Sequence, residues 1–443
     1  MSKRVRDYLF FVFIFVFILL TIFMSLYASG YKFRLSWPLD FSRLLEKTGA
    51  LALDSQPTGA SVFINDKLVH ASSFRPWNRS YQKTPAKIKN LLPGDYILRL
   101  ELDGYWPFEK RISIRSGETT FAENINLFRA AAPWLVAEGE RGDLMISPDN
   151  RYLYASGAAQ IIDLKNEQAT TIPGLASSTY GVWTRSGSRL LAGSLSYDPE
   201  KKEIVDYASL IGAQASSWRY EESSGYLYYL SGGALNRLET DGKTNTTVLK
   251  NEAIISYEPR EDIIFLVSRQ NGQSILSAYS LKDQTEKYRQ TLPADGQYSL
   301  LPENRRLISL HDEKNRTLYL FNPEGLGLLK RLDGVAAHYW LNDEQLFYSN
   351  GWEIYWLDTK SGQSWLVTRV GEAINDLAWN KEKDYLIFAT DKGLSTVDLA
   401  NGLATPVFKL DNVTFLALDD RSDALYFWAS VGRQSGVYKL PLQ

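Results

Sequence analysis

The residue types that most often carry enzyme chemistry are scarce in this sequence. It has no cysteine and only three histidines, His70, His311 and His338, no two of which are close in sequence. Disulfides, thiolate metal sites and cysteine nucleophiles are therefore excluded, and a histidine-rich metal site is not expected. His311 and His338 fall in different units of a repeat described below. They could face one channel there, although a lone histidine on such a scaffold more often only hydrogen-bonds at a strand end.

Carboxylates are abundant, with 51 Asp and Glu, and a glycoside hydrolase needs only two of them. No Gly-x-Ser-x-Gly, His-Glu-x-x-His or Gly-x-x-x-x-Gly-Lys-Ser/Thr motif accompanies them. Acids at turns between strands are usually turn formers, and we interpret the following residues in that way: Asp149, Glu222, Glu261, Asp343 and Asp384. We therefore expect no catalytic residue, no cofactor and no metal. A carboxylate site in the centre of the repeat domain is the alternative.

One segment combines basic and aromatic residues. Between Lys67 and Gly94 there are six Lys or Arg and no acid. Within residues 69–83 the basic residues alternate with aromatic ones, a pattern that suits an anionic headgroup surface or an anionic wall polymer. The candidate binding residues are Arg75, Trp77, Arg79 and Tyr81. A solvated loop that only packs on its own hairpin is the alternative.

The N-terminal region predicts a membrane anchor. Residues 8–31 carry no charge and, as a helix, would reach about 36 Å, enough for a hydrocarbon core of about 30 Å. A cleaved signal peptide is the alternative, but its apolar stretch is usually only about 7–15 residues long and ends at a small-x-small site. Here the stretch is longer, and bulky Leu26 or Tyr27 occupies the position that needs a small residue.

The charges flanking this segment set the expected orientation. Lys3, Arg4 and Arg6 precede it and Lys32 and Arg34 follow it, so the basic bias is modest. We expect residues 1–7 to be a cytoplasmic tail, residues 8–31 the membrane helix, and residues 32–49 a linker with a short helix over 38–49. The remainder would lie outside the membrane. A remainder that faces the cytoplasm is a weaker alternative.

Residues 50–128 predict a small β-domain of short strands and Gly-rich turns. Four ordered motifs resemble the PEGA domain family: Pro57-Thr58-Gly59-Ala60, Thr84-Pro85, Leu92-Pro93-Gly94-Asp95-Tyr96 and Gly104-Tyr105-Trp106-Pro107-Phe108. Thr58 stands where the family's namesake motif has Glu. The resemblance implies a β-sandwich-like module of the kind found on bacterial and archaeal envelope proteins, and it implies no catalytic residue.

Residues 132–443 repeat one unit eight times at a spacing of about 39 residues. Each unit has an aromatic-rich strand, a polar turn, an apolar strand and a third strand, which is typical of propeller blades. Units such as 147–153 resemble WD-repeat-like and TolB-like propellers, although the Trp-Asp signature is missing. Eight blades are favoured and seven are possible. Residues 134–138 are expected to supply the last blade's outer strand by pairing with the C-terminal strand.

These elements together predict a mostly β protein: a transmembrane helix, a PEGA-like β-sandwich and a C-terminal β-propeller. The 12 tryptophans mostly fall in strand patterns and suit core packing, whereas Trp352 after a turn is a better ligand candidate. A net charge of −2 gives no field for nucleic acid. We expect a single-pass, extracytoplasmic binding or scaffold protein whose partner is an envelope protein or polysaccharide. The alternative is a glycan hydrolase or lyase.

Overall fold

The computed structural model describes residues 3–33, 45–71, 80–250, 253–399, 402, 404–419 and 423–442. The chain divides into two compact units, residues 1–131 and 132–442. Within these ranges, each unit is built almost entirely from β-strands, apart from the N-terminal helix and two short helical turns.

The N-terminal helix α1 spans Lys3–Ala28. An 18-residue window within its segment Tyr8–Ala28 has a mean hydropathy of 3.0, and the segment is long and apolar enough to cross a membrane. The expected end of this helix at Tyr31 was wrong, because Tyr31–Phe33 forms strand β1. Helical hydrogen bonding ends at the turn around Gly30, whose φ is +84°, a conformation that a right-handed helix does not accommodate.

The prediction of a short linker helix over residues 38–49 was also wrong for those of its residues that the structure describes. Leu45–Lys47 is strand β2, which pairs antiparallel with β1, and residues 38–44 lie outside the described residues. A helix this short is marginal in water, whereas the extended segment gains backbone partners. Thr48 adds to them, donating its backbone N–H to the carbonyl of Gly30 at 2.8 Å.

The small β-domain consists of two sheets. One holds three strands in the order β6-β3-β9, with β3 and β9 parallel, and the other holds four in the order β5-β4-β7-β8. The strand bounds are β3 Gly49–Gln56, β4 Ser61–Ile64, β5 Lys67–Leu68, β6 Ala86–Leu91, β7 Gly94–Glu101, β8 Phe108–Ile114 and β9 Thr119–Asn126. The resulting β-sandwich confirms the fold expected from the sequence motifs.

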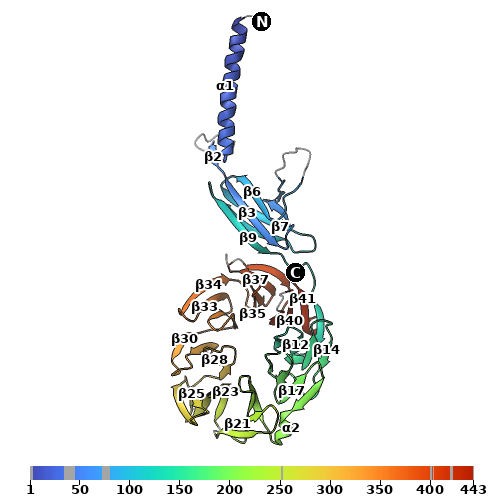
Figure 1. The fold of residues 1–443 in the computed structure, drawn as a ribbon, viewed down its shortest axis with the longest axis vertical. Coiled ribbons are helices and arrows are strands. Elements are labelled where there is room, and N and C mark those ends of the chain that lie inside the picture. The colour runs from blue at the N-terminus through green and yellow to red at the C-terminus, as the bar shows by residue number, and fades with distance from the viewer. Residues whose placement is uncertain are drawn as a thin grey trace. The chain divides into compact units, whose positions relative to one another are not determined.

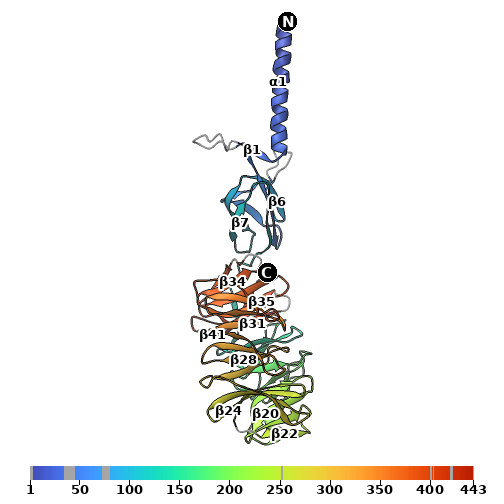
Figure 2. The ribbon, with the colours of Figure 1, turned by 90° about the vertical axis from the view of Figure 1, so that its left-hand side faces the viewer.

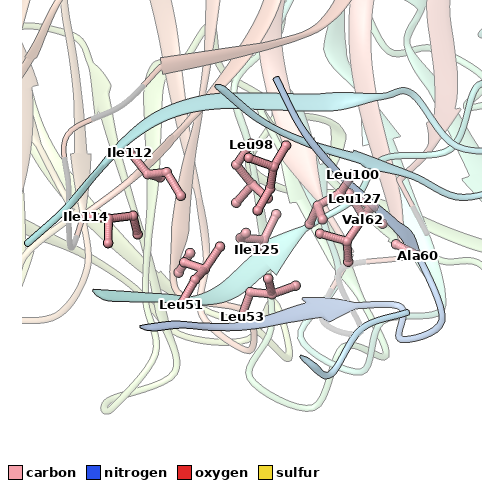
Figure 3. Close-up of a cluster of buried hydrophobic side chains, with 12 residues drawn as sticks. Leu51, Leu53, Ala60, Val62, Leu98, Leu100, Ile112, Ile114, Ile125 and Leu127 are labelled. Carbon is pink, nitrogen blue, oxygen red and sulfur yellow. The ribbon is translucent and has the colours of Figure 1, made fainter. Parts of the chain in front are cut away.

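The core of this sandwich follows from the alternation of apolar residues along its strands. Leu51 and Leu53 of β3 and Leu98 and Leu100 of β7 are 0–2% exposed, and Figure 3 shows them converging from the two sheets. Thr84 is a buried polar residue beside this core: its Oγ1 accepts the N–H groups of Gly59 (3.1 Å) and Ala60 (3.0 Å) and lies 2.6 Å from the Oγ of Ser55. That side chain fixes the turn of the Pro57–Ala60 motif.

The second unit contains eight four-stranded sheets among its described residues, arranged around a common axis (Figure 1). We number them 1 to 8 in chain order. Sheets 1–3 comprise β11 Leu144–Ile146, β12 Tyr152–Ala155, β13 Gln160–Asp163, β14 Ala169–Thr171; β15 Gly181–Trp183, β16 Leu190–Ala192, β17 Leu195–Asp198, β18 Glu203–Asp206; and β19 Ser216–Glu221, β20 Tyr226–Ser231, β21 Ala234–Glu239, β22 Asn245–Lys250.

The remaining sheets follow the same plan, and their strands are seen from the side in Figure 2. Sheets 4–6 comprise β23 Ile254–Arg260, β24 Ile263–Gln270, β25 Gln273–Ser280, β26 Thr285–Thr291; β27 Tyr298–Leu301, β28 Ile308–Asp312, β29 Thr317–Phe321, β30 Leu328–Leu332; and β31 Ala337–Trp340, β32 Gln345–Ser349, β33 Glu353–Asp358, β34 Gln363–Arg369. Sheet 7 comprises β35 Ile374–Asn380, β36 Tyr385–Thr390, β37 Gly393–Asp398 and β38 Ala404–Lys409, and sheet 8 comprises β39 Thr414–Leu418, β40 Ala424–Val431, β41 Gln434–Pro441 and β10 Trp134–Glu138. The helical turns are η2 Ser156–Ala158 and α2 Tyr207–Ile211.

Neighbouring sheets bury their faces against each other. Phe265 and Leu276 of sheet 4 pack with Leu300 and Leu310 of sheet 5 in one buried cluster. A comparable cluster joins sheet 8 to sheet 1, so the ring is closed by a core. Because neighbouring sheets cover each other's faces, middle strands are largely buried, as in β36, where all six residues are buried and five of them are apolar or aromatic.

The closing strand comes from the other end of the unit, as the sequence predicted. β10 pairs antiparallel with β41, with Trp134 opposite Lys439 and Glu138 opposite Gly436. A side chain at position 436 would meet the carbonyl oxygen of Ala137 in β10. Glycine is therefore required there for the two strands to approach.

Candidate binding site

The basic-aromatic residues proposed as a binding loop are only partly described. Arg75, Trp77 and Arg79 lie outside the described residues. Tyr81 is 47% exposed, and its ring lies 5.1 Å from that of His70, across an isolated bridge that joins the two residues. The binding role of this loop stays a prediction.

The two propeller histidines influence each other electrostatically. His338 on β31 has its Nε2 2.7 Å from Oε2 of Glu303, which follows β27. Burial lowers the pKa of His338, but the hydrogen bond and charge of Glu303 outweigh it, so the net pKa is raised. Burial lowers the pKa of His311 on β28, and the charge of His338 lowers it further. His338 is thus held by a neighbouring sheet.

Several carboxyl groups on or beside the first strands of their sheets have raised pKa values. Burial is the largest cause for Asp143, which precedes β11, for Glu258 on β23 and for Asp376 on β35, whose pKa rises to about 6. The charge of Glu303 raises the pKa of Asp143 and of Glu258 as well. A shared electrostatic environment therefore links acids from sheets 1, 4 and 5.

Most of these acids are held by protein partners. Asp376 accepts the backbone N–H groups of Leu377 and Leu416, both at 2.8 Å, and so joins sheet 7 to sheet 8. Glu303 is held by His338. Among the residues that the structure describes, no group of three or more His, Asp or Glu side chains could hold a metal ion.

A cavity of about 550 Å³ opens among sheets 2 to 5; we call it the inter-sheet cavity. Its wall includes Tyr180 before β15, Trp218 and Arg219 on β19, and Glu258 and Arg260 on β23. Each of these residues comes from the first strand of its sheet or from the residue before it. The strand order of the propeller therefore brings together residues up to 80 positions apart in the sequence.

Two ion-pair groups shape the wall of this cavity. Glu258 Oε1 lies 2.7 Å from Nε of Arg260, and both side chains are largely buried, 6% and 16% exposed. Arg260 also donates to the carbonyls of Arg305 and Leu307. At the rim, Glu222 accepts the backbone N–H of Arg185 at 2.6 Å, and its Oε2 lies 3.8 Å from Arg305. Glu222 thus bridges sheets in addition to standing at a turn.

The turn role expected of the other acids has direct support at Asp149. Its Oδ1 accepts from the Oγ of Ser147 and from the backbone N–H of Arg151. Arg219, Glu258 and Arg260 were not predicted from the sequence as site residues. A signal was available, because each of these charged residues stands within a strand that also carries aromatic residues.

Comparison with known proteins supports the small β-domain of the first unit. Residues 48–127 match the family model described as PEGA domain, which confirms the resemblance in the sequence. No curated protein matches this chain. Among solved structures, one described as the eukaryotic initiation factor is 14% identical with a TM-score of 0.47, covering 71% of this chain and 93% of its own.

Two further solved structures have similar folds. The Cps50 (Swd1) β-propeller domain of Myceliophteria thermophila is 12% identical with a TM-score of 0.43, covering 58% of this chain and 96% of its own. An oligogalacturonate lyase in complex with manganese is 16% identical with a TM-score of 0.39, covering 59% and 88%. The strand topology and the matched PEGA model together define a mostly β protein with a PEGA-type module and a β-propeller. Its function must be argued from its own residues.

Proposed function

We propose that this chain is a membrane-anchored, extracytoplasmic binding protein of the cell envelope, whose propeller presents a face to a protein or a polysaccharide. The observation that carries the anchoring is the helix segment Tyr8–Ala28, none of which is buried in the protein. Large side chains along it are open all round, as with Phe13 at 70% and Phe17 at 62% exposure. An α-helix that is apolar on every face suits lipid rather than water.

The length of the segment supports retention in the bilayer. Its 21 residues span about 31 Å as a helix, close to the hydrocarbon thickness of about 30 Å. The region of a signal peptide that precedes cleavage is usually shorter and ends at small residues. The PEGA-type module supports an extracytoplasmic position, since the family it resembles is common on envelope proteins.

The state of the charged groups supports binding in preference to catalysis. The carboxylates that approach one another in the propeller accept protein hydrogen bonds: Asp376 from backbone N–H groups, Glu303 from His338 and Glu258 from Arg260. Acids held in this way stabilise the ring and are poorly placed to exchange protons with a substrate. The inter-sheet cavity remains as a recess for a ligand.

The absence of cysteine allows a direct test of topology. A single cysteine placed at Ser2→Cys or at the exposed propeller residue Lys381→Cys is treated with a membrane-impermeant maleimide. We expect K381C to be labelled on intact cells and S2C only after lysis. The reverse pattern would refute the extracytoplasmic position, and release of the whole protein into the medium would refute the anchor.

The raised pKa values of Asp143, Glu258 and Asp376 favour a second candidate, a glycan hydrolase or lyase. A general acid needs a raised pKa in order to hold its proton near neutral pH. One assay distinguishes a binding protein from a hydrolase or lyase: envelope polysaccharide is incubated with the detergent-solubilised full chain. A binding protein retains the polymer at unchanged chain length, whereas an enzyme shortens it with time.

A further inference from the structure

We infer that the inter-sheet cavity binds a neutral, hydroxyl-rich sugar unit of an envelope polysaccharide, with Glu258 accepting and Arg219 donating hydrogen bonds to its hydroxyl groups. The inference rests on the proposed binding function and assigns that function a site and a ligand class. Two groups in the cavity wall carry the inference: a hydrogen-bond acceptor and a hydrogen-bond donor, each lacking partners. The balance of positive and negative charge around them supports it.

The first unsatisfied group is an oxygen of Glu258. This residue is 5% exposed, its Oε1 is taken by Arg260, and its Oε2 is buried with no hydrogen-bond partner among the described residues. A buried acceptor without a donor costs about 1–3 kcal/mol, so most such atoms find a partner. Glu258 lines the inter-sheet cavity, so a rotation of its side chain brings Oε2 to a ligand there that supplies the missing donor.

The second unsatisfied group is the guanidinium of Arg219. It lies over the ring of Tyr180, with its central carbon 5.3 Å from the ring centroid. Its one hydrogen bond among the described residues is a long one, 3.4 Å, to the carbonyl of Trp218. A guanidinium has five N–H donors, so Arg219 has donors available for a ligand. Its charge lowers the pKa of Glu258, which places the two groups in the same electrostatic environment.

The charges around the cavity favour a neutral ligand. Among the described lining residues, four are arginines and four are glutamates. Arg260 already neutralises Glu258 through a 2.7 Å contact, so Glu258 Oε2 needs a donor rather than a cation. An anionic ligand at Arg219 would be repelled by the neighbouring carboxylates. A hydroxyl group both donates and accepts, so adjacent hydroxyls satisfy Glu258 and Arg219 without adding charge.

Size and aromatic lining agree with a sugar. The volume of about 550 Å³ falls within the range of about 300–1,000 Å³ typical of small-ligand pockets, which combine aromatic walls with a few polar groups. Tyr180 is 40% exposed and lines the cavity with Trp218 and Tyr220. These rings offer apolar surface to the C–H face of a pyranose.

The test uses oligosaccharides released from the source organism's envelope and separated by anion exchange into neutral and acidic fractions. Each fraction is titrated calorimetrically into the detergent-solubilised full chain and three variants. Arg219→Met removes the guanidinium, and Tyr180→Ala removes the exposed ring. Arg237→Met is the matched control, because Arg237 lies over Tyr226 in the same sheet, 4.8 Å from its centroid, and neither residue lines the cavity.

We expect the neutral fraction to bind the wild type and R237M equally, and R219M and Y180A at least tenfold more weakly. The inference is overturned if only the acidic fraction binds, if neither fraction binds, or if R219M and Y180A bind as the wild type does. Failure of this site can be distinguished from failure of the proposed binding function. Retention of envelope polysaccharide with unchanged affinity in both variants would leave the proposed function standing and remove only this site.

Discussion

Nε2 of His338 lies 2.7 Å from Oε2 of Glu303, and this contact joins the first strand of sheet 6 to the loop that follows the first strand of sheet 5. This pair is therefore a side-chain contact that connects sheet 5 to sheet 6. Glu303 also raises the pKa of Tyr180, Asp143 and Glu258. Its charge acts on both the paired histidine and the wall of the inter-sheet cavity.

Replacing Glu303 with Gln should lower the pKa of His338. The hydrogen bond and charge of Glu303 are what raise that pKa against the effect of burial. The stabilisation from the pair should be full below the unfolded-state pKa of about 6.5 and should be lost as pH rises through the higher folded-state pKa. Proton NMR of the imidazole resonances measures the change, and the three histidines keep assignment simple. The exposed Glu324→Gln should leave His338 unchanged, and an equal change in both variants would contradict the prediction.

The burial of Asp376 predicts that its contribution to stability falls as pH rises. Its folded pKa is about 6 against an ordinary value of 3.8, and this difference corresponds to about 3 kcal/mol. Because the folded pKa is raised, the contribution is full below pH of about 4 and is lost by pH values above about 6. Unfolding in urea, followed by fluorescence between pH 4 and 7, should show this decline in the wild type. Asp376→Asn should lack it, and identical pH profiles would refute the assignment.

The approach of β41 to β10 predicts that Gly436→Ala destabilises the propeller. The new methyl group would meet the carbonyl oxygen of Ala137, and overpacking of this kind costs about 1–3 kcal/mol. Nine of the 12 tryptophans follow residue 132, so urea unfolding followed by tryptophan fluorescence reports mainly on this unit. Gly371→Ala is the control, because a methyl group there meets nothing within 4 Å. Equal stability of the two variants would show that the strands separate at little cost.

The buried hydroxyl of Thr84 predicts a local weakness in Thr84→Val. The N–H of Ala60 would lose its acceptor, whereas the N–H of Gly59 would keep the backbone carbonyl oxygen of residue 84. One buried group left unpaired costs about 1–3 kcal/mol. Hydrogen-exchange mass spectrometry of peptides covering 49–64 should show faster exchange than in the wild type. The exposed Thr58→Val should exchange as the wild type does. Unchanged exchange in T84V would mean that the turn does not depend on this side chain.

The repeated strand pattern carried most of the fold prediction. Period-two alternation and turn residues located the strands, because burial on one or both faces of a sheet dictates where apolar residues stand. The pairing of Trp134–Glu138 with the C-terminal strand followed from the need to complete the last sheet. The linker was harder, because its residues pair locally with Tyr31–Phe33, and three-residue strands leave almost no periodic signal.

The candidate site was largely hidden from the sequence. Tyr180, Arg219 and Glu258 come from separate sheets, about 39 residues apart, and only the ring brings them to one wall. The sequence does place Glu258 and Arg260 two residues apart in β23, where both side chains share a face. What it cannot give is the missing partner of Glu258 Oε2, since that depends on the positions of every neighbouring atom.

The pairing of β10 with β41 sets the order in which the propeller is completed. About 300 residues separate the two strands. During synthesis, β10 is therefore made first among the propeller strands and cannot pair until β41, the last strand, has been made. Until then β10 is unpaired, and the C-terminal strand of another copy of the chain could pair with it equally well. Chains held at high local density would therefore exchange this strand, unless a chaperone or slow synthesis keeps unfinished chains apart.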